Sequence, residues 1–405
     1  MSVWILGGYQ TDFARNWCRD DREFGDLTES VTAGTLEDAG VDAADIGVIH
    51  VGNAFGQLFT RQGQLGGMPA TVMPEFWEVP ATRHEAACAS GGVALLAAMA
   101  DIESGRYDSA LVLGLELERT VSGDDAAGHL GAAAWIGHEG EDARFMWPYM
   151  FSALADEYDR RYGLADAHLH AIAELNFRNA RANPNAQTRG WTFTDASFTD
   201  DDTANPIVEG RVRRTDCSQI TDGAAGVVLV GERFLARSKA PKTPAARIQG
   251  WGHRTVGLPL AQKLARSAAE PYVLPHVRNT VLDAFARAGI PGVDALDGIE
   301  THDCFTMSEY AAIDHFGITG PGESWKAVEN GDLEIGGRIP VNPSGGLIGG
   351  GHPVGATGVR MVLDAARQVT GRAGAYQIEG ARRFGTLNIG GSTTTTVSFV
   401  VGNEY

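Results

Sequence analysis

Basic side chains are scarce in this chain. Its 405 residues include 33 lysines and arginines against 51 aspartates and glutamates, so the formal net charge is −18 at pH 7. A surface of that sign repels the phosphates of nucleic acids. No local cluster compensates for it, because the longest basic stretch is Arg211-Val212-Arg213-Arg214. We therefore expect no nucleic-acid partner.

Cysteines are few, and long apolar runs are missing. The four cysteines (Cys18, Cys88, Cys217 and Cys304) lie far apart without a CxxC motif, which argues against a disulfide framework or a structural zinc site. No stretch approaches the roughly 18 apolar residues that a membrane span needs, and no basic segment precedes the short apolar run at the N-terminus. We expect a cytoplasmic protein with no membrane span and no bound metal, whose functional cysteines act as thiols.

Apolar and small residues are abundant. Hydrophobic residues make up 43% of the chain and glycines number 52, enough for a large core and about two to three domains. The residues of 3–7 and 46–51 predict buried strands, and 27–39 has apolar residues at helical spacing before Gly40. Such alternation of strand and helix is typical of an α/β fold.

The same pattern returns in the second half. A helix is predicted over 277–288, ended by Gly289, and a strand over 296–301. Both repeats finish in a phenylalanine, Phe55 and Phe305, at nearly equal distance from the helix-ending glycine. We therefore predict two duplicated α/β halves.

Composition suggests where these halves are divided. Residues 120–205 are richer in aromatic and charged side chains, which indicates an inserted segment. The N-terminal half then comprises 1–119 and 206–240, and the C-terminal half comprises 241–405. A loop over 238–244 is expected to join the halves.

A predicted strand-to-helix turn carries Cys88, within Arg83-His84-Glu85-Ala86-Ala87-Cys88-Ala89-Ser90-Gly91-Gly92. Free backbone N–H groups and the positive dipole end of a helix stabilise a thiolate, so we expect the pKa of Cys88 to be lowered and the thiol to act as a nucleophile. A packing role is the alternative, because small cysteines are common in tight turns.

Three further segments carry candidate chemistry. His352 lies in the glycine-rich run 342–358, which matches neither a P-loop nor GxGxxG and precedes a predicted helix that gathers N–H donors. Polar groups follow a predicted strand in Glu300-Thr301-His302-Asp303-Cys304-Phe305. Near the C-terminus, Thr386-Leu387-Asn388-Ile389-Gly390-Gly391 offers backbone N–H groups to an oxyanion. Taken singly, a surface histidine or a structural hydrogen-bonded cluster would also explain these patterns.

Together the segments resemble the thiolase superfamily, and within it the sterol-carrier-protein-2-type thiolases. Cys88 matches the family's nucleophile, and Gly351-His352-Pro353 matches its Gly-His-Pro motif. His302-Asp303-Cys304-Phe305 stands where a typical thiolase has Asn-Glu-Ala-Phe, in the form that marks this branch. The resemblance covers Val3 to about Val401. It implies an α/β thiolase fold, with duplicated βαβαβαββ halves in a five-layered αβαβα sandwich and a loop domain at 120–205 that covers coenzyme A (CoA).

The resemblance also implies roles for particular residues. A typical thiolase has a C-terminal Cys-x-Gly motif that supplies its acid/base cysteine, but this chain has Asn388-Ile389-Gly390. That role passes to Cys304, as in the sterol-carrier-type branch. His352 would activate Cys88, and His302 with His352 would donate hydrogen bonds to an enolate. The oxyanion hole would comprise Gly390, Cys88 and His352, and Ser218 would touch the pantetheine arm of CoA.

The implied activity is thiolysis of a 3-oxoacyl-CoA by CoA, or the reverse Claisen condensation, through an acyl-Cys88 intermediate in lipid or sterol side-chain metabolism. CoA would be a co-substrate, with no bound cofactor, and the protein would form a homodimer or homotetramer. One alternative is retro-aldol cleavage of a 3-hydroxyacyl-CoA with a small partner subunit. The others are a ketoacyl synthase and a non-catalytic acyl-CoA-binding subunit.

Overall fold

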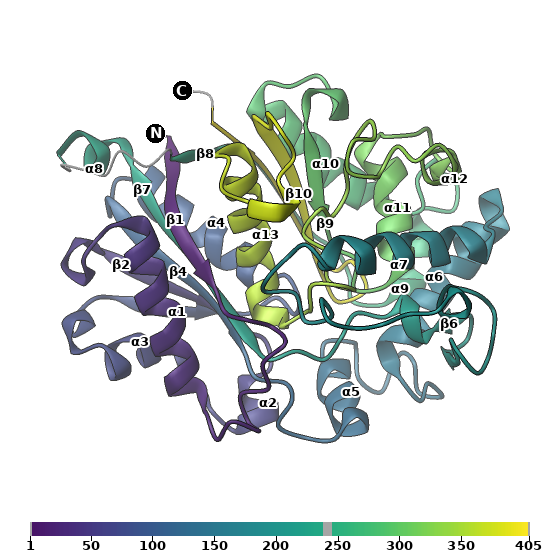
Figure 1. The fold of residues 1–405 in the computed structure, drawn as a ribbon, viewed down its shortest axis with the longest axis horizontal. Helices are drawn as coiled ribbons and strands as arrows, with labels where there is room; N and C mark the ends of the chain where they lie inside the picture. Colours follow the sequence, from purple (N-terminus) through teal and green to yellow (C-terminus); the bar gives the residue numbers. More distant parts are fainter. Residues whose placement is uncertain (1, 238–244, 404–405) are drawn as a thin grey trace.

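The computed structural model describes residues 2–237 and 245–403, and the predicted loop over 238–244 lies outside this part (Figure 1). The elements of the N-terminal half are, in chain order, β1 (Val3–Gln10), α1 (Phe24–Ala39), β2 (Val48–Gly52), α2 (Gly56–Thr60), α3 (Met68–Val72), β3 (Ala81–His84), α4 (Ser90–Glu103), β4 (Ser109–Glu116), β7 (Gly223–Gly231) and α8 (Glu232–Arg237). The predicted strands and helix of this half are confirmed, with ends that shift by a few residues.

The C-terminal half repeats much of this order. Its elements are β8 (Ala246–Thr255), α9 (Leu260–Arg266), α10 (Pro275–Ala288), β9 (Gly298–Thr301), α11 (Thr306–Phe316), α12 (Ser324–Glu329), α13 (Val354–Val369), β10 (Arg383–Gly390) and β11 (Thr395–Gly402). The helices α1 and α10 occupy equivalent places and both end at a glycine in the left-handed region, Gly40 (φ 65°) and Gly289 (φ 68°). The repeat found in the sequence is therefore a repeat of structure.

One mixed sheet runs through both halves. Its nine strands follow the order β3-β2-β4-β7-β1-β8-β11-β10-β9, and β1 pairs antiparallel with β8 where the halves meet. Within the described residues the second half has four strands in this ladder. On the outer edge of β9, Ile299 forms an isolated parallel bridge with Val341 in place of a further strand.

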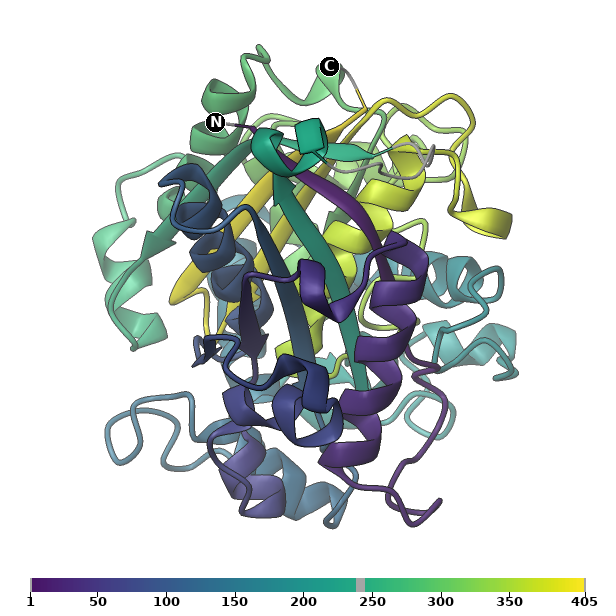
Figure 2. The ribbon, with the colours of Figure 1, turned by 90° about the vertical axis from the view of Figure 1, so that its left-hand side faces the viewer.

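Helices α4 and α13 form the centre of the molecule (Figures 1 and 2). They contact each other, α4 packs on β2 and β4, and α13 contacts β4 and β7 of the first half as well as β10 and β11 of the second. Helix α1 covers the outer face of the N-terminal strands, and α10 covers β8 and β11. This succession of layers confirms the predicted thiolase-type sandwich.

Glycines allow the two central helices to touch through their backbones. A Cβ on Gly91 would lie 2.9 Å from the Gly355 carbonyl oxygen, and one on Gly358 would lie 2.3 Å from the Gly92 nitrogen. Side chains at these positions would force the helices apart. The contact holds the beginnings of α4 and α13 together.

The segment 120–205 carries α5 (Gly123–Gly131), α6 (Met146–Tyr162) and α7 (Asp166–Ala180); β5 (Ile207–Glu209) and β6 (Val212–Arg213) follow it. Helices α6 and α7 pack against α11 of the C-terminal half. The Phe151 and Phe305 rings stack at 4.7 Å between centroids, and the Tyr158 hydroxyl donates a 2.9 Å hydrogen bond to Asp314. These contacts tie the aromatic segment to the loop that follows β9 and to α11.

Candidate active site

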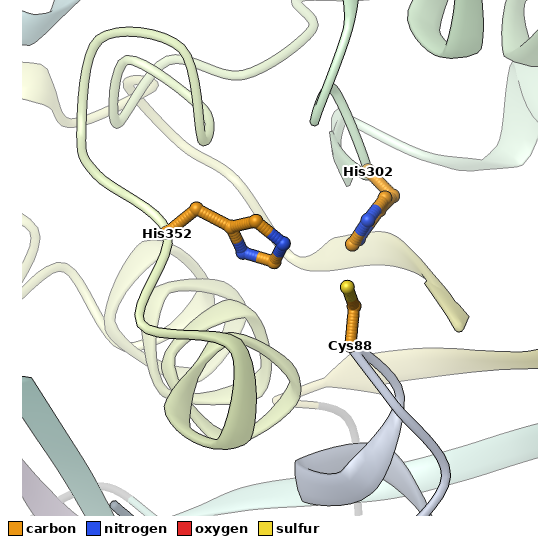
Figure 3. Close-up of side chains that lie close together, drawn as sticks. All are labelled: Cys88, His302 and His352. Carbon is orange, nitrogen blue, oxygen red and sulfur yellow. The ribbon is translucent and has the colours of Figure 1, made fainter. Parts of the chain in front are cut away.

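Cys88, His302 and His352 converge from three distant segments of the chain (Figure 3). One ligand-type atom from each, the cysteine sulfur and a nitrogen of either imidazole, lies within 4.8 Å of the other two. The imidazole rings meet edge to face, with centroids 5.1 Å apart and planes at 84°. The structure thus brings together three of the residues that the sequence singled out.

Cys88 lies in a tight turn between β3 and α4. Ala87, just before it, has φ of 50°, which is strained for a residue with a Cβ, and the Ala89 and Ser90 amides close the turn onto Ala86 and Ala87. Burial, followed by the Glu118 carboxylate, raises the pKa of the Cys88 thiol to about 12, although the backbone N–H groups of Gly391 and Cys88 lower it. The expectation of a lowered pKa is therefore wrong, because desolvation and negative charge outweigh the amide donors.

His352 precedes α13 and is fixed in one orientation. Its backbone N–H donates to the Thr221 hydroxyl (2.9 Å), and its Nδ1 lies 2.7 Å from the Thr357 hydroxyl oxygen. The Thr357 hydroxyl also lies 3.1 Å from the Pro353 carbonyl oxygen, which can only accept, so we infer that the hydroxyl donates to this carbonyl and accepts the Nδ1–H of His352.

The other nitrogen of His352 is left with a free lone pair. Nε2 is buried and has no hydrogen-bond partner among the described residues. Burial, followed by Arg360, lowers the pKa of His352 to about 3, so the imidazole is neutral. A neutral imidazole with a free Nε2 beside a thiol is arranged as a general base.

His302 and Cys304 both lie in the loop after β9. Burial, followed by the proximity of His352, holds the pKa of His302 well below its ordinary value. Burial and the nearby Cys88 raise the pKa of Cys304 well above its ordinary value, so this thiol carries its proton at neutral pH. A protonated thiol next to the nucleophile can serve as an acid.

Asp303, between these two residues, has a structural role. Its carboxylate accepts the Leu347 and Ile348 amides at 2.6 and 3.1 Å and the Asn176 side-chain amide at 2.9 Å. It thereby fixes the glycine-rich loop that leads to His352. The segment therefore has the structural role that its sequence left open, and it also places His302 and Cys304 at the candidate site.

Strand β10 brings Asn388 and Gly390 to the site, and Gly391 follows directly after it. The Asn388 side-chain nitrogen donates to the Cys88 carbonyl oxygen (3.0 Å) and lies 3.3 Å from Nδ1 of His302. A Cβ on Gly390 would lie 2.2 Å from the Ala86 carbonyl oxygen, so only glycine fits against the turn that carries Cys88. The amide that reaches the thiol belongs to Gly391, one residue beyond the predicted oxyanion-hole position.

A cavity of about 280 Å³ opens above these groups. Cys88, Cys304, His352, Ser218 and Gly391 line it; His302 and Gly390 are not among its lining residues. Its apolar wall comes largely from the aromatic segment and neighbouring loops and includes Leu130, Phe145, Met146, Trp147, Phe151, Ile220 and Phe305. Ser218 also donates its backbone N–H to the Cys304 carbonyl oxygen at 2.9 Å, which places it beside the candidate acid.

The sequence analysis missed two buried glutamates next to the site, of which Glu118 lines the cavity and Glu116 does not. Glu116, the last residue of β4, accepts the Gly355 amide at 3.0 Å, and Glu118 accepts the Val354 amide at 2.8 Å. They therefore bind the N-terminal amides of α13. Burial raises the pKa of Glu116 to about 7 and that of Glu118 well above its ordinary value. Their spacing on a strand end, Glu-Leu-Glu, was the available signal.

A buried arginine network stabilises the second half of the site. Arg360 on α13 donates to Glu300 (2.8 Å), Asp364 (2.9 Å) and Ser344 (2.8 Å). Burial is the main cause of the lowered pKa of both His302 and His352, and the nearby charge of Arg360 lowers both further. Since the sequence places Arg360 in mid-helix, nothing there distinguished it from a surface residue.

Among the described side chains, Cys88, His302 and His352 lie close enough together to share one metal ion. Neutral imidazoles and a thiol are ligands that Zn²⁺ accepts.

In the part of the chain that the structure describes, no helix is both long and apolar enough to cross a membrane.

Comparison with known proteins identifies the family. Residues 3–191 match the thiolase N-terminal domain, and residues 261–403 match the thiolase C-terminal domain-like model. An acetyl-CoA acetyltransferase of Methanothermobacter thermautotrophicus is 32% identical over 394 residues, which cover 97% of each chain. Sterol carrier protein 2 of Homo sapiens is 27% identical over 420 residues, covering 98% of this chain and 71% of that one.

The chain belongs to the thiolase family. The predicted family and the predicted class of enzyme, an acyltransferase, are both confirmed by these relatives.

Solved structures agree on the fold. An Ltp2-ChsH2(DUF35) aldolase matches with a TM-score of 0.77 at 19% identity, covering 99% of this chain and 97% of that one. An acetyl-CoA acetyltransferase from Syntrophomonas wolfei matches with a TM-score of 0.70 at 17% identity, covering 100% and 99%. At such identities the likeness concerns the fold alone.

Proposed function

We propose that this thiolase transfers acyl groups between 3-oxoacyl-CoA and CoA through a thioester on Cys88. The observation that carries the proposal is the convergence of a thiol, a neutral imidazole with a free Nε2 and a second protonated thiol at one apolar cavity. These are the nucleophile, base and acid that a reversible cleavage of a carbon–carbon bond requires.

The first step is attack by Cys88 on the 3-keto carbon. Because the thiol is protonated at rest, we infer that its proton moves to Nε2 of His352 as the carbon–sulfur bond forms. The bond between Cα and Cβ then breaks, and its electron pair forms the enolate of the departing acyl-CoA. Cys304 gives its proton to the enolate carbon, which leaves acyl-Cys88 and a Cys304 thiolate.

The second step returns the enzyme to its starting state. The CoA thiol gives its proton to the Cys304 thiolate, and the CoA sulfur attacks the Cys88 thioester. The tetrahedral oxyanion would be held by backbone amides of Cys88 and of the Gly390–Gly391 turn. Cys88 leaves as a thiolate that recovers the proton held by His352.

The cavity supports a preference for bulky, apolar acyl groups. Its aromatic wall would bury the apolar surface of an acyl chain. The carboxyl group of Glu118, which also lines the cavity, is bound to the Val354 amide at the N-terminus of α13. We propose an acyl chain from lipid or sterol side-chain degradation as the substrate class, Ser218 as a contact of the pantetheine arm, and residues 120–205 as the cover of bound CoA. We further propose that the enzyme is a homodimer or homotetramer.

The test is mass spectrometry of the protein after brief exposure to a 3-oxoacyl-CoA without free CoA. We expect an acyl mass on the peptide that contains Cys88, its loss when CoA is added, and no adduct in Cys88→Ala. A matched Cys18→Ala variant should be acylated normally, since Cys18 is exposed and outside the cavity.

The same experiment distinguishes the aldolase alternative, which is worth testing because an aldolase shares the fold. Cleavage of a 3-hydroxyacyl-CoA by Cys88→Ala, with no adduct on the unaltered protein from short, long or branched 3-oxoacyl-CoA, would overturn the thiolase proposal. Binding of acyl-CoA without either cleavage would favour a non-catalytic subunit.

A further inference from the structure

Asn388 connects the nucleophile's backbone with the second histidine. Its side-chain nitrogen lies 3.0 Å from the Cys88 carbonyl oxygen and 3.3 Å from Nδ1 of His302. An amide NH₂ group has two hydrogens and no acceptor. The NH₂ group can therefore form hydrogen bonds with both neighbours at once only if each of them acts as an acceptor.

The orientation of this amide is set by its surroundings. The Cys88 carbonyl oxygen can only accept, so the nitrogen of Asn388 must face it; the reverse orientation would bring two oxygens together. This holds even though Oδ1 of Asn388 is buried without a hydrogen-bond partner among the described residues. Gly92 and Gly358 leave room for that oxygen, since a Cβ on either would lie 2.9 or 2.4 Å from it.

His302 must therefore accept at Nδ1. A neutral imidazole carries one hydrogen, and when Nδ1 accepts, the hydrogen is on Nε2. We propose that Asn388 is a positioning residue that keeps the proton of neutral His302 on Nε2, so that this imidazole is a hydrogen-bond donor toward the reacting oxygen atoms.

The two histidines then have opposite tautomers. Thr357 holds the proton of His352 on Nδ1 and leaves Nε2 as an acceptor, whereas Asn388 leaves Nε2 of His302 as a donor. Resting on the proposed thiolase reaction, this gives one imidazole to receive the Cys88 proton and one to stabilise the enolate or thioester oxygen.

The tautomer can be measured without substrate. We propose long-range ¹H–¹⁵N correlation spectra of protein labelled with ¹⁵N-histidine, in which His302→Gln assigns the His302 signals. The unaltered protein should show His302 protonated on Nε2. In Asn388→Asp the carboxylate can only accept, so the proton should move to Nδ1, while the surface control Asn279→Asp should leave it on Nε2.

Steady-state kinetics of 3-oxoacyl-CoA cleavage provide a second test. We expect Asn388→Asp to lower kcat for 3-oxoacyl-CoA cleavage by about 100-fold or more, the usual cost of losing one oxyanion donor, with a much smaller change in KM. His302 protonated on Nδ1 in the unaltered protein, or a tautomer unmoved by a folded Asn388→Asp, would overturn the inference. The predicted tautomers together with no acylation of Cys88 would instead reject only the proposed reaction.

Discussion

Cys88, the proposed nucleophile, is held as an uncharged thiol. Glu118 contributes to this, because its carboxylate lies in the same cavity and is the largest charged influence on Cys88. Attack must then be coupled to proton transfer, and the thiol is protected from indiscriminate alkylation while the site is empty.

We predict that Glu118→Gln lowers the pKa of Cys88. A glutamine carries no charge that could disfavour the thiolate at any pH, while its amide oxygen can still accept the Val354 N–H. Alkylation of Cys88 by iodoacetamide, followed against pH, should become several-fold faster near pH 8. Glu309→Gln, a change at another buried glutamate outside the cavity lining, should leave the alkylation rate unchanged. An unchanged rate in Glu118→Gln would show that burial alone holds the proton.

Cys304 should be needed only where a carbon–carbon bond breaks. We predict that Cys304→Ala slows acylation of Cys88 by a 3-oxoacyl-CoA by about 100-fold or more, because the enolate loses its acid. Acylation by a simple acyl-CoA involves no carbon acid and should proceed at nearly the normal rate. Rapid-quench mass spectrometry with both substrates measures the difference. Equal losses for the two substrates would assign Cys304 a structural role.

At the scale of elements, the crossing of α4 and α13 determines the site, since each helix begins just after a catalytic candidate. We predict that Gly358→Ala lowers the free energy of unfolding by about 1–3 kcal/mol or more, because the atom nearest to the added methyl, the Gly92 nitrogen at 2.3 Å, belongs to backbone that cannot move aside. Thermal unfolding measures this. Gly128→Ala in α5, where a Cβ meets nothing within 4 Å, should stabilise by up to about 1 kcal/mol. A native melting temperature in Gly358→Ala would contradict the packing argument.

The sequence revealed elements better than contacts. Apolar periodicity and the helix-ending Gly40 and Gly289 were local signals, so the strands, helices and duplication could be predicted. The strand β10 was missed because Arg383–Gly390 contains two glycines and is short of apolar alternation. The role of Asn388 depends on contacts with residues 86 and 300 positions away, which no local pattern contains. Thr357 lies only five residues after His352, but the meeting of its hydroxyl with Nδ1 depends on side-chain orientations that the sequence does not show.

On the scale of the whole molecule, buried carboxyl groups determine how stability depends on pH. Burial raises the pKa of Glu300 to about 7 and that of Glu309 to about 8. The folded chain thus binds protons that the unfolded chain releases above pH 4.5, so stability falls as pH rises toward 8. The buried histidines act in the opposite sense, but only below about pH 6.5, where unfolded imidazoles are charged.

We therefore predict that the free energy of unfolding is lower at pH 8 than at pH 6.5. Glu309 alone should account for a decrease on the order of 1–2 kcal/mol, and Glu309→Gln should remove that part of the slope. Urea unfolding at both pH values, at one protein concentration, provides the measurement. Parallel slopes for the two proteins would mean that Glu309 is ionised in the folded chain.

Helix α13 belongs to the second half of the sequence, yet its first amides are bound by Glu116 and Glu118 of the first half. This has a consequence for synthesis on the ribosome, where the N-terminal part emerges first. Cys88 is translated more than 260 residues before His352, so a growing chain carries an ordinary, unassisted thiol. Catalysis cannot begin in a fragment, because the base reaches the nucleophile only when the last helix is seated between the halves.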